Sequence, residues 1–336
     1  MRTLVLGGSS FVGGRLVKKL VENGDEVTTL NRGKSGGAQD GVQQLIADRR
    51  DLSSMTSALA GKEWDAVYDV SGYIMATDAD NFAGLVDLVD GAVGRYVYVS
   101  SVMAYAQSGI FPWTEDFAQR DEPATTYGGL KVFAENLLLE RYRSTGLPAV
   151  VARPAAIYGP DNNIFDMESA MFTRLRKGLP ILVPHGGLVT GSWGHVDDFV
   201  SALTVMASHE AAPGEIFNVT GAGVTARTYV ETLAEVVGAE AHIVPVPDEL
   251  LPELDKPAFC RLFRERHHGV LSTQKLHDVL GVPPERDFRT GHEQTYQWFL
   301  QSPLASEATN LADPLWGKGF DLDFEAEVVA RLGVDA

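Results

Sequence analysis

The sequence contains very little cysteine and no long hydrophobic run. Its single cysteine, Cys260, cannot form a disulfide within the chain, which fits a reducing compartment. No stretch of about 18 apolar residues is present to cross a membrane, and the first residues lack the pattern of a secretory signal. We therefore expect a cytoplasmic protein without a membrane partner.

Basic side chains are also scarce, with 28 lysines and arginines against 45 aspartates and glutamates and a net charge of −17. A negative surface repels phosphate backbones, so we predict no nucleic-acid partner. A local basic pocket for a small anionic ligand remains compatible with this charge. His267 and His268 have no carboxylates at metal-binding spacing, so we predict no metal site.

A strand, a glycine-rich turn and a helix follow one another at the start of the chain. Residues 3–6 are an apolar run typical of a buried strand, and residues 11–22 have helical apolar periodicity. Glycines between them let the backbone approach a pyrophosphate, which the helix N-terminus attracts. The spacing Gly7-x-x-Ser10-x-x-Gly13 leaves a purely structural turn as the alternative. The residues predicted to bind a dinucleotide here are Gly7, Ser9, Ser10, Phe11, Val12 and Gly13.

The second predicted strand, residues 26–30, ends in Asn31-Arg32-Gly33-Lys34-Ser35. A cofactor without a 2′-phosphate usually meets an acidic residue at this place, and none is present. Asn31 and Arg32, with Lys34 and Ser35 nearby, suit a 2′-phosphate instead. We therefore predict NADP as the cofactor, with NAD as the less favoured choice and a merely solvated loop as the structural alternative.

Strands and helices alternate with short connections through the first half of the chain. Further strands are predicted at residues 42–47, 66–70, 95–100 and 148–153, and helices at 53–60, 77–89 and 127–143. This rhythm predicts an α/β fold with a Rossmann-type doubly wound parallel sheet. The mixed pattern after residue 153 predicts a smaller, interleaved C-terminal substrate-binding lobe. We place the dinucleotide-binding domain at residues 1–160, completed by elements from about 190–225, and the lobe with a C-terminal extension mainly at 161–336.

Tyr127 and Lys131 lie four residues apart on one predicted helix, so they share a face. A tyrosine hydroxyl has a reference pKa of about 10, and a nearby ammonium lowers it by favouring the phenolate. The tyrosine can then exchange a proton with a substrate hydroxyl while hydride moves to or from a nicotinamide. Ser101, at the end of a predicted strand, is in position to hold the substrate oxygen. We expect these three residues to be catalytic.

Five motifs occur in order along the first 235 residues. They are Gly7-Gly-Ser-Ser-Phe-Val-Gly13, Tyr98-Val-Ser-Ser-Val-Met-Ala-Tyr105, Tyr127-x-x-x-Lys131, Arg153-Pro-Ala-Ala-Ile-Tyr-Gly-Pro160 and His195-Val-Asp-Asp198. Together they resemble the extended short-chain dehydrogenase/reductases, the NAD-dependent epimerase/dehydratase family, which mostly act on nucleotide sugars.

The resemblance implies roles for individual residues. Tyr127 would be the acid/base, Lys131 its partner that also bonds the nicotinamide ribose, and Ser101 the hydroxyl that holds the substrate oxygen. Pro154 and Ile157 would border the nicotinamide, while Gly7, Ser10 and Gly13 would line the pyrophosphate. His195 and Asp197 resemble the family's structural motif that joins the two lobes.

Two departures from the family pattern are Ser10, where a glycine is usual, and Asn31-Arg32 in place of the acidic residue. They resemble an atypical branch that includes chloroplast stem-loop RNA-binding proteins and isoflavone-reductase-like enzymes. We predict an NAD(P)-dependent epimerase, dehydratase or reductase that acts on a nucleotide sugar or a related carbonyl or hydroxyl compound. A non-catalytic NADP(H)-binding or RNA-associated protein is the alternative, although the net charge argues against RNA. A homodimer remains open.

Other candidate residues lie at strand ends and in loops. Asp48 and Arg49 could flank an adenine, with an ordinary helix cap as the alternative for part of that segment. The cofactor contacts predicted from their strand-end positions are Val70, Ser71 and Ser100. The residues predicted to meet substrate are Tyr73, Tyr105, Asn163 and Arg227. The aromatic rings among them could instead pack loops, and basic helix residues such as Arg174, Arg176 and Lys177 could meet a diphosphate or simply be solvated.

Overall fold

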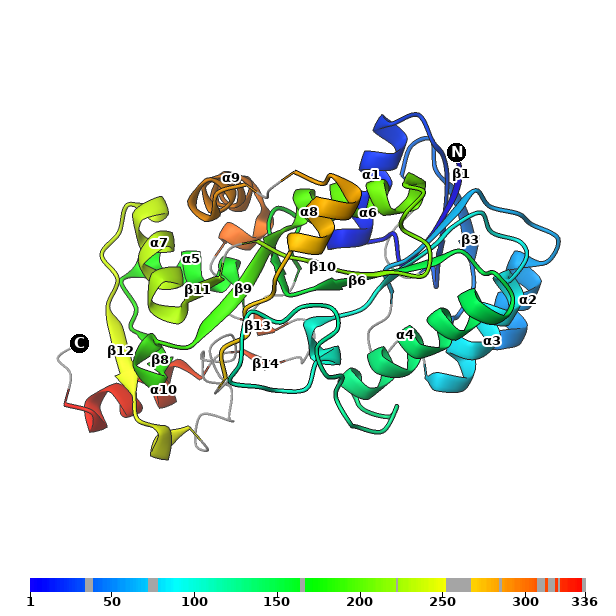
Figure 1. Ribbon diagram of the computed structural model, residues 1–336. Helices are drawn as coiled ribbons and strands as arrows, with labels where there is room; N and C mark the ends of the chain where they lie inside the picture. The colour runs from blue at the N-terminus through cyan, green and yellow to red at the C-terminus, as the bar shows by residue number, and fades with distance from the viewer. Residues whose placement is uncertain are drawn as a thin grey trace.

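A parallel sheet of seven strands forms the centre of the computed structural model (Figure 1). Its order is β10-β6-β5-β4-β1-β2-β3. The strands are β1 (Arg2–Leu6), β2 (Glu26–Asn31), β3 (Gln43–Ile46), β4 (Ala66–Asp69), β5 (Tyr96–Val99), β6 (Ala149–Pro154) and β10 (Ile216–Val219). The chain winds outward from β1 in both directions, which confirms the predicted doubly wound α/β fold. The structure describes residues 1–33, 39–71, 78–163, 167–221, 223–251, 267–283, 286–306, 312–313, 318–319 and 321–333.

Helices cover both faces of this sheet. On one face lie α1 (Phe11–Glu22), α6 (Val196–Ser208) and α8 (Gln274–Leu280), and on the other lie α2 (Leu52–Leu59), α3 (Ala79–Val89) and α4 (Tyr127–Ser144). Successive side chains of a strand point to opposite faces. In β1, Val5 accordingly packs in the core on the α1 side, whereas Leu4 and Leu6 pack in the core on the α3 and α4 side.

The second lobe, at the left of Figure 1, is built on two small sheets. One contains β7 (Ala156–Tyr158), β9 (Thr190–His195) and β11 (Gly223–Thr225), and the other pairs β8 (Ile181–Pro184) with β12 (Ile243–Val246). They pack with α5 (Glu168–Lys177), α7 (Ala226–Val237) and α9 (Phe288–Gln301). Between β9 and β11 the chain returns to the first lobe as α6 and β10, so the two lobes are interleaved in sequence.

Short elements complete the fold. They are the 3-10 turns η1 (Val102–Ala104), η2 (His185–Gly187), η3 (Asp248–Leu250) and η6 (Pro303–Ala305), the strands β13 (Ala312–Asp313) and β14 (Lys318–Gly319), and the helix α10 (Leu322–Arg331). Most predicted elements lie within a few residues of their observed bounds. The exact division of the chain into domains stays a prediction.

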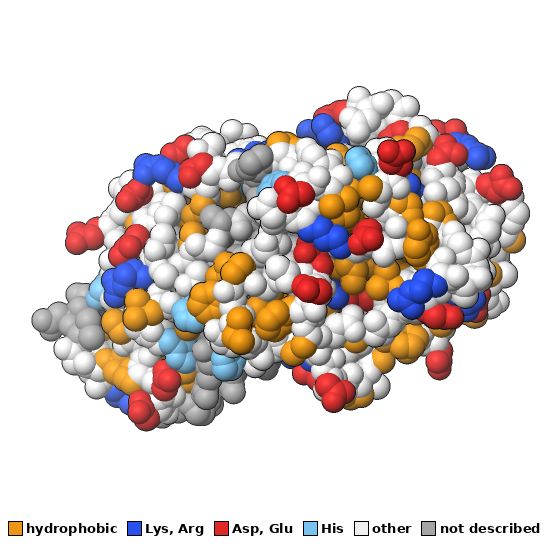
Figure 2. All heavy atoms as spheres, viewed as in Figure 1, with side chains coloured by type: hydrophobic (Ala, Val, Ile, Leu, Met, Phe, Trp, Pro, Cys, Tyr) orange, Lys and Arg blue, Asp and Glu red, His pale blue; other side chains and the backbone are white. Residues whose placement is uncertain are grey.

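The face shown in Figure 2 carries acidic and basic side chains scattered among one another. Over the described part of the chain, that face shows no continuous basic stripe of the kind that follows a nucleic-acid backbone (Figure 2). Among the helices that the structure describes, none is both long and apolar enough to span a lipid bilayer.

Candidate active site

The predicted catalytic and cofactor residues gather at one edge of the sheet. Because β1, β4 and β5 are parallel neighbours, their carboxyl ends meet there. The residues that follow these ends are Gly7 after β1, Val70 and Ser71 after β4, and Ser100 and Ser101 after β5. Ligands of open α/β sheets bind outside this edge, where the strand order reverses.

The glycine turn is shaped for the close approach of a ligand and a helix. A Cβ on Gly7, whose φ is +93°, would lie 2.6 Å from the Cβ of Ser71. A Cβ on Gly13 would lie 2.0 Å from the carbonyl oxygen of Gly7, so only glycine lets α1 pack this near to β1. Both positions therefore require glycine, as the predicted dinucleotide site does.

Ser10 precedes α1 as its N-cap residue, yet its side chain makes no capping hydrogen bond. The first N–H groups of a helix have no partner within the helix, and they bind anions. The Ser10 hydroxyl is exposed at the same end of the helix. This cradle suits a pyrophosphate, so the residues present fit a dinucleotide cofactor.

An open cleft of about 490 Å³ begins at this helix end. Ser9, Ser10 and Phe11 line one side of it, and the second-lobe segment 161–163 lines another. Trp298 of α9 also lines the cleft. Asn163, which we predicted to meet substrate, thus lies in the cleft that contains the cofactor turn.

At the end of β2, the side-chain oxygen of Asn31 is hydrogen-bonded to other residues of the protein. Its Oδ1 accepts hydrogen bonds from the Gly33 backbone N–H at 2.8 Å and from Gln44 Nε2 at 3.0 Å. Arg32 is exposed. Hydrogen bonds from Arg50 lower the pKa of Asp48, and the charge of Arg32 adds to this effect. Lys34 and Ser35 lie outside the described residues.

Arg49 is buried and binds Asp69 through both terminal nitrogens, one of them 2.6 Å from Oδ2. Arg49 Nη1 also donates to Ser71 Oγ at 2.7 Å, and Tyr96 Oη donates to Asp69 Oδ2 at 2.8 Å. Burial opposes ionisation of Asp69, but the charge and hydrogen bonds of Arg49 prevail and lower its pKa. The guanidinium of Arg49 is thus bound to Asp69 and Ser71, and its predicted place beside an adenine stays a prediction.

Tyr127 and Lys131 are brought together as predicted. Tyr127 is the first residue of α4, which Thr126 caps by accepting a hydrogen bond from the Gly129 N–H at 3.1 Å. Lys131 Nζ lies 5.6 Å from the centre of the Tyr127 ring and donates to the carbonyl oxygen of Val99 at 2.7 Å. The ammonium group is therefore fixed between the end of β5 and the tyrosine.

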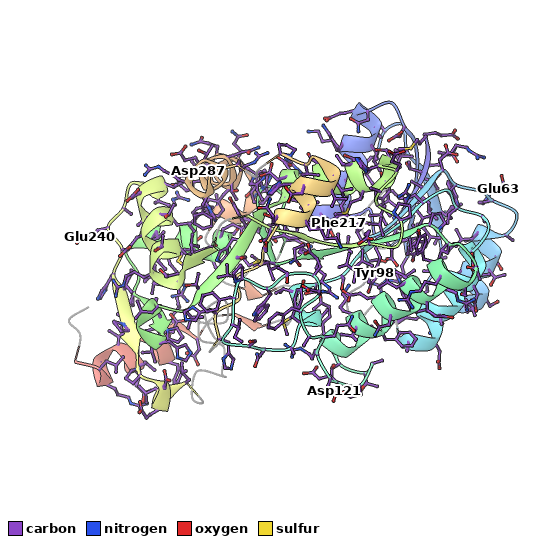
Figure 3. The ribbon with its side chains drawn as sticks, viewed as in Figure 1. Glu63, Tyr98, Asp121, Phe217, Glu240 and Asp287 are labelled. Atoms are coloured by element: carbon purple, nitrogen blue, oxygen red, sulfur yellow. The ribbon has the colours of Figure 1, made fainter. Side chains whose placement is uncertain are left out.

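Lys131 is only 2% exposed. Its Nζ also lies 4.9 Å from the centre of the ring of Tyr98, which belongs to β5 and packs against α4 (Figure 3). Burial lowers the pKa of Lys131 to about 7, although the nearby charge of Asp69 acts in the opposite direction. The side chain is thus able to change its protonation near neutral pH, which suits a partner in proton transfer.

The two serines after β5 have different environments. Ser101 is the N-cap of η1, and its Oγ accepts a hydrogen bond from the Met103 N–H at 3.1 Å. Ser100 is buried and donates to Glu135 Oε1 at 2.5 Å. Ser100 therefore anchors α4 to the sheet, and its predicted contact with the cofactor stays a prediction.

Glu135 was not singled out from the sequence, although it follows Lys131 by one helical turn. It is fully buried and accepts hydrogen bonds from Arg153 Nε at 2.9 Å and from Arg153 Nη2 at 2.6 Å. The family-like spacing of Tyr127 and Lys131, extended by four residues, is the sequence signal that could have found it. The pair fixes the rotation of α4 and hence the position of Lys131.

Tyr105, a predicted substrate contact, is 1% exposed. Its hydroxyl donates to Asn218 Oδ1 at 2.7 Å, and its ring packs against Trp113 with 5.6 Å between centres. This corrects the prediction, because the buried ring packs loops together, as the alternative reading had it. Tyr73 lies outside the described residues.

The basic helix residues of the second lobe are also engaged. Arg174 is fully buried and binds both carboxylate oxygens of Glu325 on α10, at 2.6 and 2.7 Å, so it is not placed to meet a diphosphate. Arg227, at the start of α7, forms an ion pair with Glu231, with 3.6 Å between Nη1 and Oε1. Pro154 ends β6 and Ile157 lies in β7, where the chain leaves the large sheet for the second lobe.

His195 acts as the N-cap of α6, and its Nδ1 accepts a hydrogen bond from the Asp197 N–H at 3.2 Å. Burial lowers the pKa of His195 to about 4, so the ring is neutral at physiological pH. These contacts suit the predicted structural role at the junction of the lobes.

The family model described as the NAD dependent epimerase/dehydratase family matches residues 3–220. The chloroplast stem-loop binding protein of 41 kDa b from Arabidopsis thaliana is 32% identical over 311 residues, which cover 88% of this chain and 78% of that protein. The UDP-glucose 4-epimerase of Mycolicibacterium smegmatis is 30% identical over 326 residues, covering 89% and 98% of the two chains.

Solved structures resemble the chain at the level of the fold. The UDP-glucose 4-epimerase of Thermotoga maritima has a TM-score of 0.75 at 22% identity, and the match covers 90% of this chain and 99% of that one. The dTDP-glucose 4,6-dehydratase DesIV of Streptomyces venezuelae, solved with NAD bound, has a TM-score of 0.74 at 23% identity, with coverages of 92% and 100%. With its glycine turn, its strand-edge site and its match to the family model, the chain belongs to the NAD dependent epimerase/dehydratase family.

Proposed function

We propose that this protein is an epimerase, dehydratase or reductase that acts on a nucleotide sugar by hydride transfer assisted by Tyr127 and Lys131. The observation that carries this proposal is the position of Lys131. Its ammonium is buried beside the Tyr127 ring at the sheet edge where the glycine turn also lies. A lysine with a purely structural role is not expected at such a site, because burying an ammonium group without a full ion pair costs free energy.

Each residue has a separate task in this mechanism. The Tyr127 hydroxyl holds and moves the proton of the substrate oxygen, and the Lys131 ammonium stabilises the phenolate that forms. The Ser101 hydroxyl donates to the same substrate oxygen and fixes its direction. Glu135 and Ser100 hold α4 against β5, so that Tyr127 does not shift during the reaction. The nicotinamide of a bound cofactor would supply or accept the hydride.

The nucleotide-sugar class is supported by relatives. They include a UDP-glucose 4-epimerase at 30% identity and a dTDP-glucose 4,6-dehydratase at 26% identity, and both matches span nearly the whole relative. The second lobe, most of which follows the Rossmann half along the chain, would bind the nucleotide sugar next to Tyr127. Arg227, partly buried at the start of α7, remains a candidate for its phosphates.

For the cofactor, we propose a preference for NADP(H) over NAD(H). Exposed Arg32 supports it, as does Asn31, whose oxygen is bound to Gly33 and Gln44 rather than directed at a ribose. A carboxylate that would repel a 2′-phosphate is missing from the end of β2, although Asp48 lies near Arg32. Several solved neighbours were determined with NAD, so titration of both dinucleotides decides the matter.

An RNA-associated role is the second candidate, because the relative at 32% identity is a chloroplast stem-loop binding protein. The net charge of −17 weighs against it, since RNA binding requires local neutralisation of phosphates. A filter-binding assay with a stem-loop RNA at physiological salt separates the two candidates. Retention of the RNA would favour the second.

The proposed enzyme is tested by replacing Tyr127 with Phe, which removes only the hydroxyl. Thermal-shift measurements with NAD(H), NADP(H) and nucleotide sugars first identify the ligands, because a ligand of the folded state raises Tm. With the ligands that bind, Tyr127→Phe should abolish turnover and leave the cofactor-induced rise in Tm intact. Retained turnover would exclude the mechanism.

A further inference from the structure

The second-lobe segment 159–163 is anchored on its inner side to α5, and its outer side lies at the cleft that contains the cofactor turn. Glu168, the first residue of α5, is fully buried, and its Oε1 accepts hydrogen bonds from the Gly159 N–H at 3.0 Å and from Asn162 Nδ2 at 2.9 Å. These bonds fix the inner side of the segment. Its outer residues, Asp161 and Asn163, line the cleft that begins at Ser9 and Ser10.

Arg15 connects this segment to the cofactor half of the protein. It lies on α1, about one turn after the glycine turn, and also lines the cleft. Its Nη1 binds Asp161 Oδ2 at 3.1 Å, while Nε and Nη2 bind Asp197 Oδ1 at 2.9 and 2.5 Å. One guanidinium therefore joins α1, the start of α6 and the second lobe.

The two ends of this contact differ in character. Asp197 lies within the packed junction, where its Oδ2 is 3.8 Å from Arg286 Nη1 and accepts a hydrogen bond from Gln294 Nε2 at 3.3 Å. Asp161 is about half exposed at 49%, and it adopts a left-handed backbone with a φ of +68°. Burial would lower the pKa of Arg15, but the hydrogen bonds and charges of Asp197 and Asp161 raise it. Asp161 is thus the end of the contact that can open.

We propose that the ion pair between Arg15 and Asp161 is a latch that holds segment 161–163 beside the N-terminus of α1, where the dinucleotide phosphates would bind, and limits how fast the cofactor exchanges. This inference rests on the proposed dinucleotide-dependent function. Ser9, Ser10 and the N-terminus of α1 lie on one side of the cleft, and the latched segment lies on another. A cofactor with its phosphates at the N-terminus of α1 would share the cleft with this segment, so the pair would oppose both its entry and its release.

The latch bears on the class of reaction. An epimerase or a dehydratase returns the hydride to its substrate and works best when the cofactor stays bound between turnovers. A reductase releases its cofactor in every cycle. An ion pair that slows exchange therefore favours the retaining classes within the proposed function.

Asp161→Asn tests the latch with little change in shape. Asparagine tolerates the left-handed backbone as well as aspartate does, so the segment keeps its conformation while the charge is lost. Stopped-flow fluorescence with NADPH and NADH gives both rate constants. We expect association and dissociation to become roughly two- to fivefold faster, as the loss of a partly exposed ion pair implies, with little change in Kd.

The matched control is Asp65→Asn. Asp65 forms an exposed ion pair with Arg2 at 3.4 Å, at the amino end of the sheet. This variant loses the same charge and should exchange cofactor at the wild-type rate. A second test uses salt, which screens ion pairs. Raising the ionic strength should accelerate cofactor release in the wild type more than in Asp161→Asn.

The outcomes separate the latch from simple charge repulsion and from a failure of the proposed function. If Asp161 only repels the phosphates, Asp161→Asn will release the cofactor more slowly, which would overturn the latch. Unchanged release in Asp161→Asn, or equal acceleration in Asp65→Asn, would overturn it as well. Wild-type protein that binds neither dinucleotide would overturn the proposed function and the latch together.

Discussion

Glu135 and Arg153 form a buried, two-pronged ion pair one helical turn from Lys131, with exposed fractions of 0% and 1%. Gln119 Nε2 adds a hydrogen bond to Glu135 Oε2 at 3.1 Å, and Arg153 Nη1 donates to the carbonyl oxygen of Glu115 at 3.1 Å. Nearly every polar atom of the pair is thus satisfied. The pair joins α4 to β6 directly beneath the candidate catalytic residues.

We expect Glu135→Gln to destabilise the protein by about 3 kcal/mol, because it leaves the buried Arg153 charge without its counter-charge. Turnover should fall as well, since α4 carries Tyr127. Chemical denaturation measures the first effect. The control, Glu293→Gln, removes an exposed ion pair with Arg289 and should leave stability unchanged. Equal effects of the two changes would contradict the role given to Glu135.

Arg49→Lys separates the observed position of Arg49 from the one predicted from the sequence. Lysine cannot bind both oxygens of Asp69 and also reach Ser71, so we expect a lower Tm and weaker dinucleotide binding. If Arg49 instead flanked an adenine, Tm would stay constant and only the affinity for adenosine nucleotides would fall. Thermal unfolding with and without AMP distinguishes these results.

Glu168 predicts a pH dependence of stability. Burial raises its pKa to about 7, whereas in the unfolded chain the value is 4.5. The folded state therefore holds a proton that the unfolded state has lost, and stability contributed by this group falls as the pH rises from 4.5 to about 7. Glu168→Gln carries no titrating proton. The Tm of Glu168→Gln minus the Tm of the wild type should therefore increase as the pH rises through this window. A difference that does not change with pH would contradict the raised pKa assigned to Glu168.

Arg32→Ala tests the cofactor preference. Removing the exposed guanidinium should raise the Kd for NADPH about tenfold, as the loss of a charge-assisted contact with phosphate implies, and leave the Kd for NADH nearly constant. Arg2→Ala, at the opposite edge of the sheet, is the control for a change in net charge. Parallel weakening of both dinucleotides by Arg32→Ala would show that no 2′-phosphate is recognised at this position.

The features that depend on local sequence were predictable. The alternation of strands and helices predicted the fold, because parallel strands joined by helices form a doubly wound sheet. The four-residue spacing of Tyr127 and Lys131 predicted their contact, because residues four apart share a helix face. The pairs Arg49–Asp69 and Glu135–Arg153 were not found, since their partners lie on different elements and no periodicity connects them. Tyr105 was misplaced because an aromatic ring in a loop has the same sequence appearance whether it is buried or exposed.

Asn163 and Asp161 illustrate a further limit of sequence-based reasoning. Their place beside α1 depends on how the second lobe packs against the first, and on Glu168, which holds their segment from within. Residue types near a predicted turn give no information on that packing. Arg15 was likewise unremarkable on a helix surface, where charged residues are usually solvated.

The position of β10 has a consequence for biosynthesis. This strand completes the sheet by pairing with β6, and its Phe217 packs below α8, where Lys275 lies 5.0 Å from the ring centre (Figure 3). Until the ribosome has produced β10 and α8, the nascent first lobe has an unpaired edge and an uncovered apolar face. Such surfaces attract other chains. A fragment ending at residue 160 should therefore aggregate instead of folding alone, and the two lobes must mature as one unit.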